Sequence, residues 1–299
     1  MWEKGRTGRS SRGCARRGPL VLLAVLASLV SGCGQPAAKP PAPPADTAGP
    51  ADPVRPVPSG HGPVLSVRYE PPATAADRRD AAFLRTSRAV EEAAAALAGF
   101  LRWGARRPVP LVVRSCAGEG PSYDPEARRV EICYDEVAET RELFRDAGVR
   151  PAGTDADVRA VLLETLFHES AHALVDVLGL DVSALAPDGN EEDAADRFAA
   201  LMLLRGGEPG ERRLLAAAGA WQASAEVYEE AADDEHSSDR ERAEAIRCWV
   251  YGAAPARRRA LAASPDGPLP ATRAAGCGEE WRAARTGWTG ALRGSGVLG

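Results

Sequence analysis

Two histidines and a glutamate within LETLFHESAHALVDVLG, residues 163–179, could do chemistry by their types and spacing. His168 and His172 lie four positions apart, and Glu169 follows the first of them. Residues four apart in a helix share a face, so the two imidazoles would point the same way. Both could then bind one zinc ion, with the neighbouring carboxylate beside an open coordination position, which is the HExxH arrangement.

The helix that would carry these residues is apolar on most sides. Glu164, His168, His172 and Asp176 form one narrow polar row, and leucine and valine cover much of the remaining surface. A solvated stripe on a surface helix is the alternative, but a helix this apolar is not expected to be largely exposed. Burying histidines beside carboxylates costs free energy unless something pairs them. A zinc ion would supply that pairing, so the pattern predicts a metal site.

A second acidic segment, GNEEDAADRFAALML at residues 189–203, offers further ligands. A catalytic zinc site wants a third protein ligand and one position left for water. The acids also have a structural explanation, because Asn190 is a good N-cap and carboxylates in a first turn favour the helix dipole. Their spacing is distinctive: Glu192 is twenty residues beyond His172, and Asp196 is four beyond Glu192.

With HExxH, this spacing resembles the gluzincins, the thermolysin-like metallopeptidases. The resemblance implies Glu192 as the third metal ligand, with Glu191 and Asp193 as alternatives. It implies Asp196 as the acceptor that fixes the tautomer of a metal-bound imidazole. Asp176 matches the HExxHAxxD continuation and is implied as another support for a ligand.

A smaller family of exported bacterial proteins, assigned as metallopeptidases of unknown function, is a closer match. The resemblance covers most of residues 110–290. Its counterparts here are ICYDEV (132–137), HESAHALVD (168–176), EDAAD (192–196), DEHSSD (234–239), CWVYG (248–252) and CGEEW (277–281).

Zinc-dependent hydrolysis of a peptide or protein is the activity that this site would support. Glu169 would act as general base, taking a proton from water and passing it to the leaving amine. His236 is a candidate donor to the oxyanion, with Tyr134 and Tyr228 as weaker candidates. The alternative for His236 is a surface histidine ahead of a helix capped by Ser238. Two other functions stay open: a catalytically silent metal-binding scaffold, and an amidase acting on cell-wall peptides.

The N-terminus reads as an export signal over residues 1–32. Six basic residues precede the apolar run PLVLLAVLASLV at 19–30 and the small residues before Cys33. Val30-Ser31-Gly32-Cys33 resembles a bacterial lipobox, which predicts that Cys33 carries a lipid; an ordinary signal peptide with an incidental cysteine is the alternative. Residues 33–63 are rich in proline and read as a tether. The chain is therefore expected to be a cell-envelope lipoprotein, on a periplasmic or extracellular face.

Charge and cysteine content narrow the class of protein further. Removing residues 1–32 leaves 31 basic and 41 acidic residues, a net charge of −10, so nucleic acid is not an expected partner. Four cysteines remain beyond Cys33, which in an exported protein indicates disulfides with three possible connectivities. We favour the shorter loops, Cys116–Cys133 and Cys248–Cys277.

The elements that must position the site follow an α+β plan. One domain, residues 64–299, is expected to hold a small antiparallel or mixed N-terminal sheet followed by a mainly helical, zincin-like part. The oligomeric state is not predicted. Strands are predicted at 64–70, 109–116 and 128–135, and helices at 77–103, 135–146, 155–179, 191–205, 211–232, 239–251 and 278–292.

Overall fold

A computed structural model describes residues 65–103, 106–148, 153–187, 189–229, 236–263 and 267–298. All of these residues belong to one compact unit of the chain. The predicted export signal, Cys33 and the tether lie outside the described residues. Within the described ranges, no helix has the length and apolar character needed to cross a bilayer.

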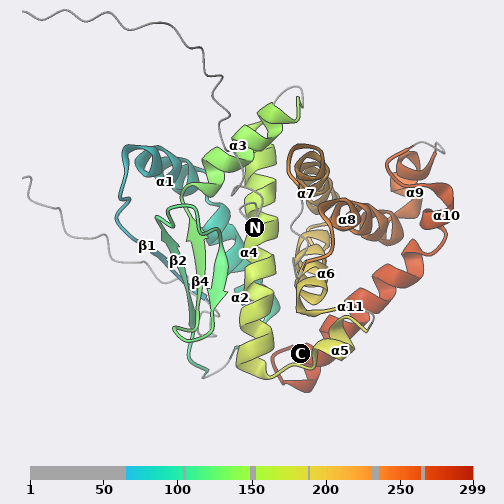
Figure 1. Cartoon of the computed structure of the whole chain (residues 1–299). Helices are drawn as coiled ribbons and strands as arrows, with labels where there is room; N and C mark the ends of the chain where they lie inside the picture. The colour runs from blue at the N-terminus through green and yellow to red at the C-terminus, as the bar shows by residue number, and fades with distance from the viewer. Residues whose placement is uncertain are drawn as a thin grey trace, which may run out of the picture. The chain divides into compact units, whose positions relative to one another are not determined.

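Four strands form a mixed sheet with the order β1-β2-β4-β3. Their bounds are Leu65–Tyr69 for β1, Val109–Arg114 for β2, Ser122–Asp124 for β3 and Arg129–Cys133 for β4. The first, second and fourth strands run parallel, and β3 pairs antiparallel with β4 at one edge. Together with the helices that follow, this confirms the α+β prediction (Figure 1).

Helices make up most of the described residues, and α4 runs through the middle of them (Figure 1). It packs against α2 and the strands β3 and β4, and also against α6 and α7. The longer helices are α1 (Ala75–Ser87), α2 (Ala89–Phe100), α3 (Glu136–Asp146), α4 (Asp155–Leu178), α6 (Glu191–Leu204), α7 (Gly207–Val227), α8 (Asp239–Ala253) and α11 (Cys277–Gly294). The short ones are α5 (Val182–Leu185), α9 (Pro255–Arg258), α10 (Ala271–Ala274) and the 3₁₀ turn Arg259–Ala262.

Local sequence signals set both ends of α4. Thr154 caps its start in a capping box with Asp157, which satisfies backbone N–H groups that the helix leaves unpaired. Gly179 ends it at φ 60°, a left-handed conformation that glycine adopts without strain. Nearly every residue from Val158 to Val175 is buried, so the helix is held from all sides and can keep polar side chains in fixed positions.

The helix α6 is held in place at both of its sides. Asn190 and Asp193 form a capping box at its start. From α11, Trp288 donates its indole N–H to the carbonyl of Ala194 at 2.8 Å and packs on Phe198. Because α6 also packs along α4, the acids in its first two turns lie beside the histidines.

The predicted single helix over 77–103 is wrong, because the structure breaks it into α1 and α2 at Arg88. Arg88 has φ 54°, and its N–H bonds to the carbonyl of Leu84. The Ser87 hydroxyl donates to the same carbonyl, while Arg159 of α4 donates to the carbonyl of Ser87 at 2.9 Å. A tertiary contact therefore stabilises this break in the helix, and the local sequence contains no glycine or proline that would predict it.

Two disulfides join Cys116 to Cys133 and Cys248 to Cys277, the pairs with the shorter loops. Cys133 ends β4, and Cys116 follows the neighbouring parallel strand β2. Strands that run parallel end at the same edge of a sheet, which brings the two cysteines together. The second bond links α8 to the start of α11.

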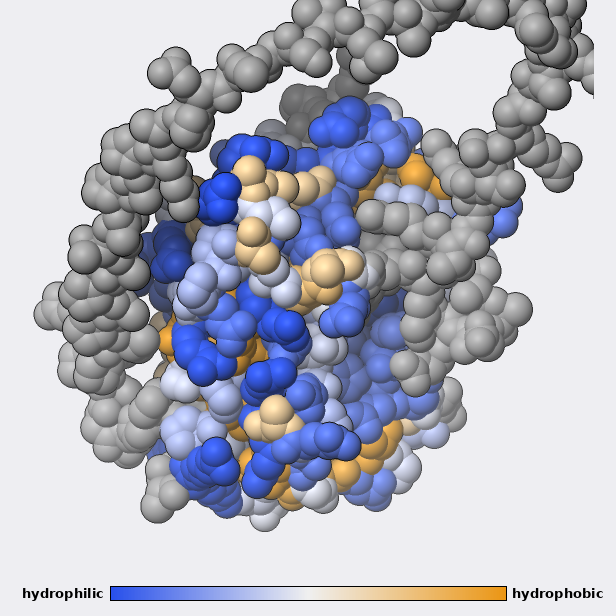
Figure 2. Space-filling view, turned by 60° about the vertical axis from the view of Figure 1, so that its left-hand side comes forward, coloured by the Kyte–Doolittle hydropathy of each residue, from blue (hydrophilic) through white to orange (hydrophobic). Residues whose placement is uncertain are grey.

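The surface of the described part is largely hydrophilic on the face drawn in Figure 2. Hydrophobic side chains appear there only in small, separate patches. No broad apolar area on that face calls for a partner.

Candidate metal centre

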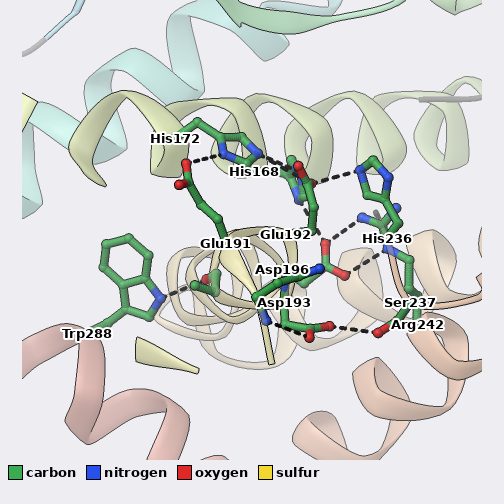
Figure 3. A network of polar contacts seen from close by, with 12 residues as sticks. His168, His172, Glu191, Glu192, Asp193, Asp196, His236, Ser237, Arg242 and Trp288 are labelled. Carbon is green, nitrogen blue, oxygen red and sulfur yellow. Dashed lines mark hydrogen bonds and ion pairs between the residues drawn. The ribbon is translucent and has the colours of Figure 1, made fainter. Parts of the chain in front are cut away.

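Three side-chain atoms, two from α4 and one from α6, lie close together (Figure 3). The Nε2 atoms of His168 and His172 lie 3.2 Å apart. Glu192 of α6 places its Oε2 atom 3.0 Å from the first of these nitrogens and 3.4 Å from the second. The sequence brings these atoms together because α4 presents both histidines on one face, towards the first turn of α6.

These separations fit a divalent metal ion. Zinc binds histidine nitrogen and carboxylate oxygen at about 2.0–2.2 Å with tetrahedral geometry, so its ligand atoms lie about 3.3 Å from one another. The three observed distances, 3.0, 3.2 and 3.4 Å, are close to this ligand–ligand distance. Two imidazoles and one carboxylate also form a donor set that catalytic zinc sites use, with one position left over.

The other ring nitrogen of each histidine has a carboxylate partner. The Nδ1 atom of His168 lies 2.8 Å from Oδ1 of Asp196, and that of His172 lies 2.9 Å from Oε1 of Glu191. An imidazole that donates from Nδ1 presents its Nε2 lone pair to the centre. Both rings are thereby oriented for metal binding.

Electrostatics at the centre also favour a cation. Burial alone would lower the pKa of His168, but hydrogen bonds to Asp196 and Glu192 raise it to about 10. Burial alone would raise the pKa of Glu192, yet its hydrogen bonds with His168, His172 and His236 leave that pKa well below its usual range. The carboxylates thus draw positive charge to this point, and a bound metal ion would supply it in place of protons.

Glu169 lies beside the convergence and is buried, with an exposed fraction of 5%. Burial raises the pKa of its carboxyl group, although the nearby His168 and His172 act in the opposite direction. Within the described part of the chain, no side chain or backbone group forms a hydrogen bond with this carboxyl group. It is therefore available to exchange a proton with a bound molecule.

His236, which precedes α8, also reaches the centre. Its Nε2 atom lies 2.8 Å from Oε2 of Glu192, and its ring stacks at a distance on that of His168, with centroids 6.2 Å apart. His168, Glu192 and His236 form one of the clusters of potential metal ligands among the described residues. The only other histidine of the predicted domain thus lies at the site.

Three residues proposed from the sequence, Asp176, Tyr134 and Asp193, have partners outside the cluster of three atoms. Asp176 accepts a hydrogen bond from the hydroxyl of Tyr123 at 2.6 Å, one turn beyond His172, so it ties β3 to α4. Tyr134 is buried and donates to the carbonyl of Glu70, the residue after β1. Asp193, an alternative third ligand, accepts from the backbone of Asn190 and from the hydroxyl of Ser237 at 2.8 Å. Tyr228 directly follows the end of α7.

Two residues at the site make contacts that the sequence did not predict. Glu191 was considered only as an alternative ligand, whereas it contacts the far side of the His172 ring. From the sequence, Arg242 could be expected to neutralise nearby acids but was assigned no chemistry; the structure shows that it forms a two-pronged ion pair with Asp196. The capping box that Ser238 forms with Glu241 starts α8 three residues before Arg242, but only the packing of α8 shows where that side chain points.

Comparison with known families agrees with this geometry. The model of a family described as putative metallopeptidase, DUF4344, matches residues 69–292. The chain belongs to this family. The match begins at the last residue of β1 and includes β2 to β4 and the helices α4, α6 and α8 around the candidate centre. No curated protein and no solved structure matches the chain.

Proposed function

We propose that this protein hydrolyses peptide bonds with a zinc ion bound by His168, His172 and Glu192, and with Glu169 as the general base. The single observation that carries the proposal is the meeting of two imidazole nitrogens and one carboxylate oxygen within 3.4 Å of one another. Membership in a family described as putative metallopeptidase supports the same reaction class.

The chemistry divides between the metal ion and the chain. When bound, zinc supplies Lewis acidity that lowers the pKa of water towards about 7 and polarises a carbonyl group. Glu169 accepts the proton of the attacking water and returns it to the leaving amine. Burial favours this shuttle because it disfavours the charged carboxylate, so protonation of Glu169 costs less free energy than protonation of an exposed carboxylate. No serine or cysteine nucleophile is needed.

We propose that the substrate is a peptide that binds in an extended conformation. The outermost strand β3 pairs on one side with β4, and Tyr123 of β3 is bonded to α4 one turn beyond His172. A strand edge offers backbone donors and acceptors to an extended chain.

Digestion of a peptide library by the purified protein tests this proposal, with zinc measured in the same sample. We expect about one zinc per chain and cleavage that stops on chelation and returns when zinc is added back. Zinc without cleavage of any peptide would support a silent metal-binding scaffold instead. Cleavage of purified wall fragments alone would point to a wall amidase.

His236 is proposed to stabilise the oxyanion that forms on the scissile carbon. Its Nε2 atom already lies at the centre, beside Glu192, and donors of this kind contribute about 10²–10³-fold to kcat. His236→Ala should therefore lower kcat by roughly that factor and leave the zinc affinity unchanged. Steady-state kinetics and zinc titration check both. Weakened zinc binding in the variant would show that His236 is instead a metal ligand.

We also propose that the enzyme is exported and held at the cell envelope through a lipid on Cys33, on the strength of the Val30–Cys33 segment. Cys33→Ser should move the protein from the membrane fraction to the soluble fraction. An unchanged distribution would argue against the anchor.

A further inference from the structure

A buried cluster of charged side chains lies behind His168, on the side away from the metal centre. Glu164, Asp196 and Arg242 are 2%, 6% and 3% exposed. They come from three different helices, α4, α6 and α8, and Trp221 of α7 completes the cluster. The proposed reaction uses neither Glu164 nor Arg242.

Arg242 makes the most specific contacts in this cluster. Its Nε atom donates to Oδ2 of Asp196 at 2.8 Å, and a terminal nitrogen donates to Oδ1 at 2.5 Å. Its guanidinium group lies 3.6 Å from the centre of the Trp221 ring (Figure 3 shows the ion pair). Two parallel hydrogen bonds and one stacked face fix the orientation of both the arginine and the carboxylate.

The same Asp196 oxygen that receives the terminal nitrogen of Arg242 also contacts Nδ1 of His168. The contacts therefore run in series from the guanidinium group of Arg242 to the carboxylate of Asp196 and on to Nδ1 of His168. The Nε2 atom of the same ring faces the metal centre. A rotation of the carboxylate would move the hydrogen bond that orients this ring.

Stability alone gives a weak reason for this arrangement. Taking charged groups out of water costs several kcal/mol per ion, and well-packed apolar residues often replace a buried ion pair without loss. Glu164 adds a second acid to the cluster, with Oε1 buried and without a hydrogen-bond partner among the described residues. The arrangement is better explained by what the fixed carboxylate does for His168.

We propose that Arg242 is a positioning residue of the metal centre, which locks Asp196 so that His168 keeps its Nε2 atom aimed at the metal. This inference rests on the proposed zinc site. Arg242 would increase the metal affinity through Asp196 and would itself touch neither the metal nor the substrate.

Zinc titration of the four members of a double-mutant cycle tests this role: wild type, Arg242→Met, Asp196→Asn and the double variant. Loss of a partner behind a metal ligand typically weakens metal binding by about 10–100-fold, and we expect this for each single variant. Because Arg242 acts through Asp196, the double variant should bind zinc as tightly as Asp196→Asn alone. The double variant also removes the buried carboxylate that has lost its arginine in Arg242→Met and would destabilise that variant.

Arg258→Met is the matched control. Arg258 pairs with the buried Glu211 at 2.7 Å between α7 and α9, away from the metal centre. Its loss also takes an arginine from a buried acid, and Glu211 then keeps Arg257, as Asp196 keeps His168 in Arg242→Met. It should lower the unfolding midpoint and leave the zinc Kd unchanged. If Arg242→Met does not fold, Arg242→Lys takes its place, since lysine keeps the charge and loses the two-pronged geometry.

The outcomes separate this inference from the proposed function. A wild-type protein that binds no zinc overturns both. Tight wild-type binding with an unchanged Kd in Arg242→Met overturns the positioning role alone. Losses that multiply in the double variant also overturn it, because they would show that Arg242 and Asp196 act independently.

Discussion

Replacement of Glu169 by glutamine is expected to remove hydrolysis while the metal stays bound. The amide has nearly the shape of the carboxyl group, so packing around this buried position should survive. It cannot accept and return a proton, and general acid–base catalysis contributes about 10²–10⁴-fold. We therefore expect kcat to fall by about that factor, measured on a fluorogenic peptide, with zinc content equal to that of the wild type.

A shorter acid is the matched control for this variant. Glu169→Asp keeps the carboxyl group but withdraws it by one methylene, so it should retain more activity than the glutamine variant. Full activity in Glu169→Gln would rule out the proposed base. Loss of zinc from that variant would instead assign Glu169 to metal binding.

Replacement of Glu192 by glutamine is expected to have the largest effect on metal affinity. This carboxylate faces three imidazoles, whereas its neighbours Glu191 and Asp193 have other partners. Zinc affinity should fall by more than the roughly 10–100-fold that loss of an outer partner costs. A ligand that binds only the folded state raises the free energy of unfolding, by about 2.7 kcal/mol when its concentration is 100 times the Kd. Added zinc should therefore raise the Tm of the wild type but not of this variant.

The two neighbouring acids serve as controls, because the sequence left all three open as ligands. Asp193→Asn should bind zinc like the wild type, since Asp193 caps α6 and bonds to Ser237. Glu191→Gln should weaken binding moderately, because its partner is the outer nitrogen of His172. A larger loss in either variant than in Glu192→Gln would assign the third ligand differently.

Sequence patterns predicted the helices of the site well. The range 155–179 corresponds to α4 at Asp155–Leu178, and 191–205 corresponds to α6 at Glu191–Leu204. Both helices begin at capping residues that can be recognised locally, Thr154 and Asn190. Spacing of four within a helix also predicted correctly that His168 and His172 share a face.

What the sequence missed depends on contacts between elements. The three residues of β3 pair with the edge of β4 that β2 does not cover, and their own short sequence does not reveal that edge. The break at Arg88 depends on Arg159 from another helix. Likewise, Asp176 shares a helix face with the histidines, but its partner Tyr123 comes from the sheet. Periodicity shows which face a side chain occupies and not which element lies opposite.

The most direct test of the account is anomalous diffraction at the zinc edge from crystals of the purified protein. We expect one peak about 2.0–2.2 Å from Nε2 of His168, Nε2 of His172 and a carboxylate oxygen of Glu192. A peak at another group of residues, or none after zinc is supplied, would contradict the central claim that these three side chains hold one metal ion.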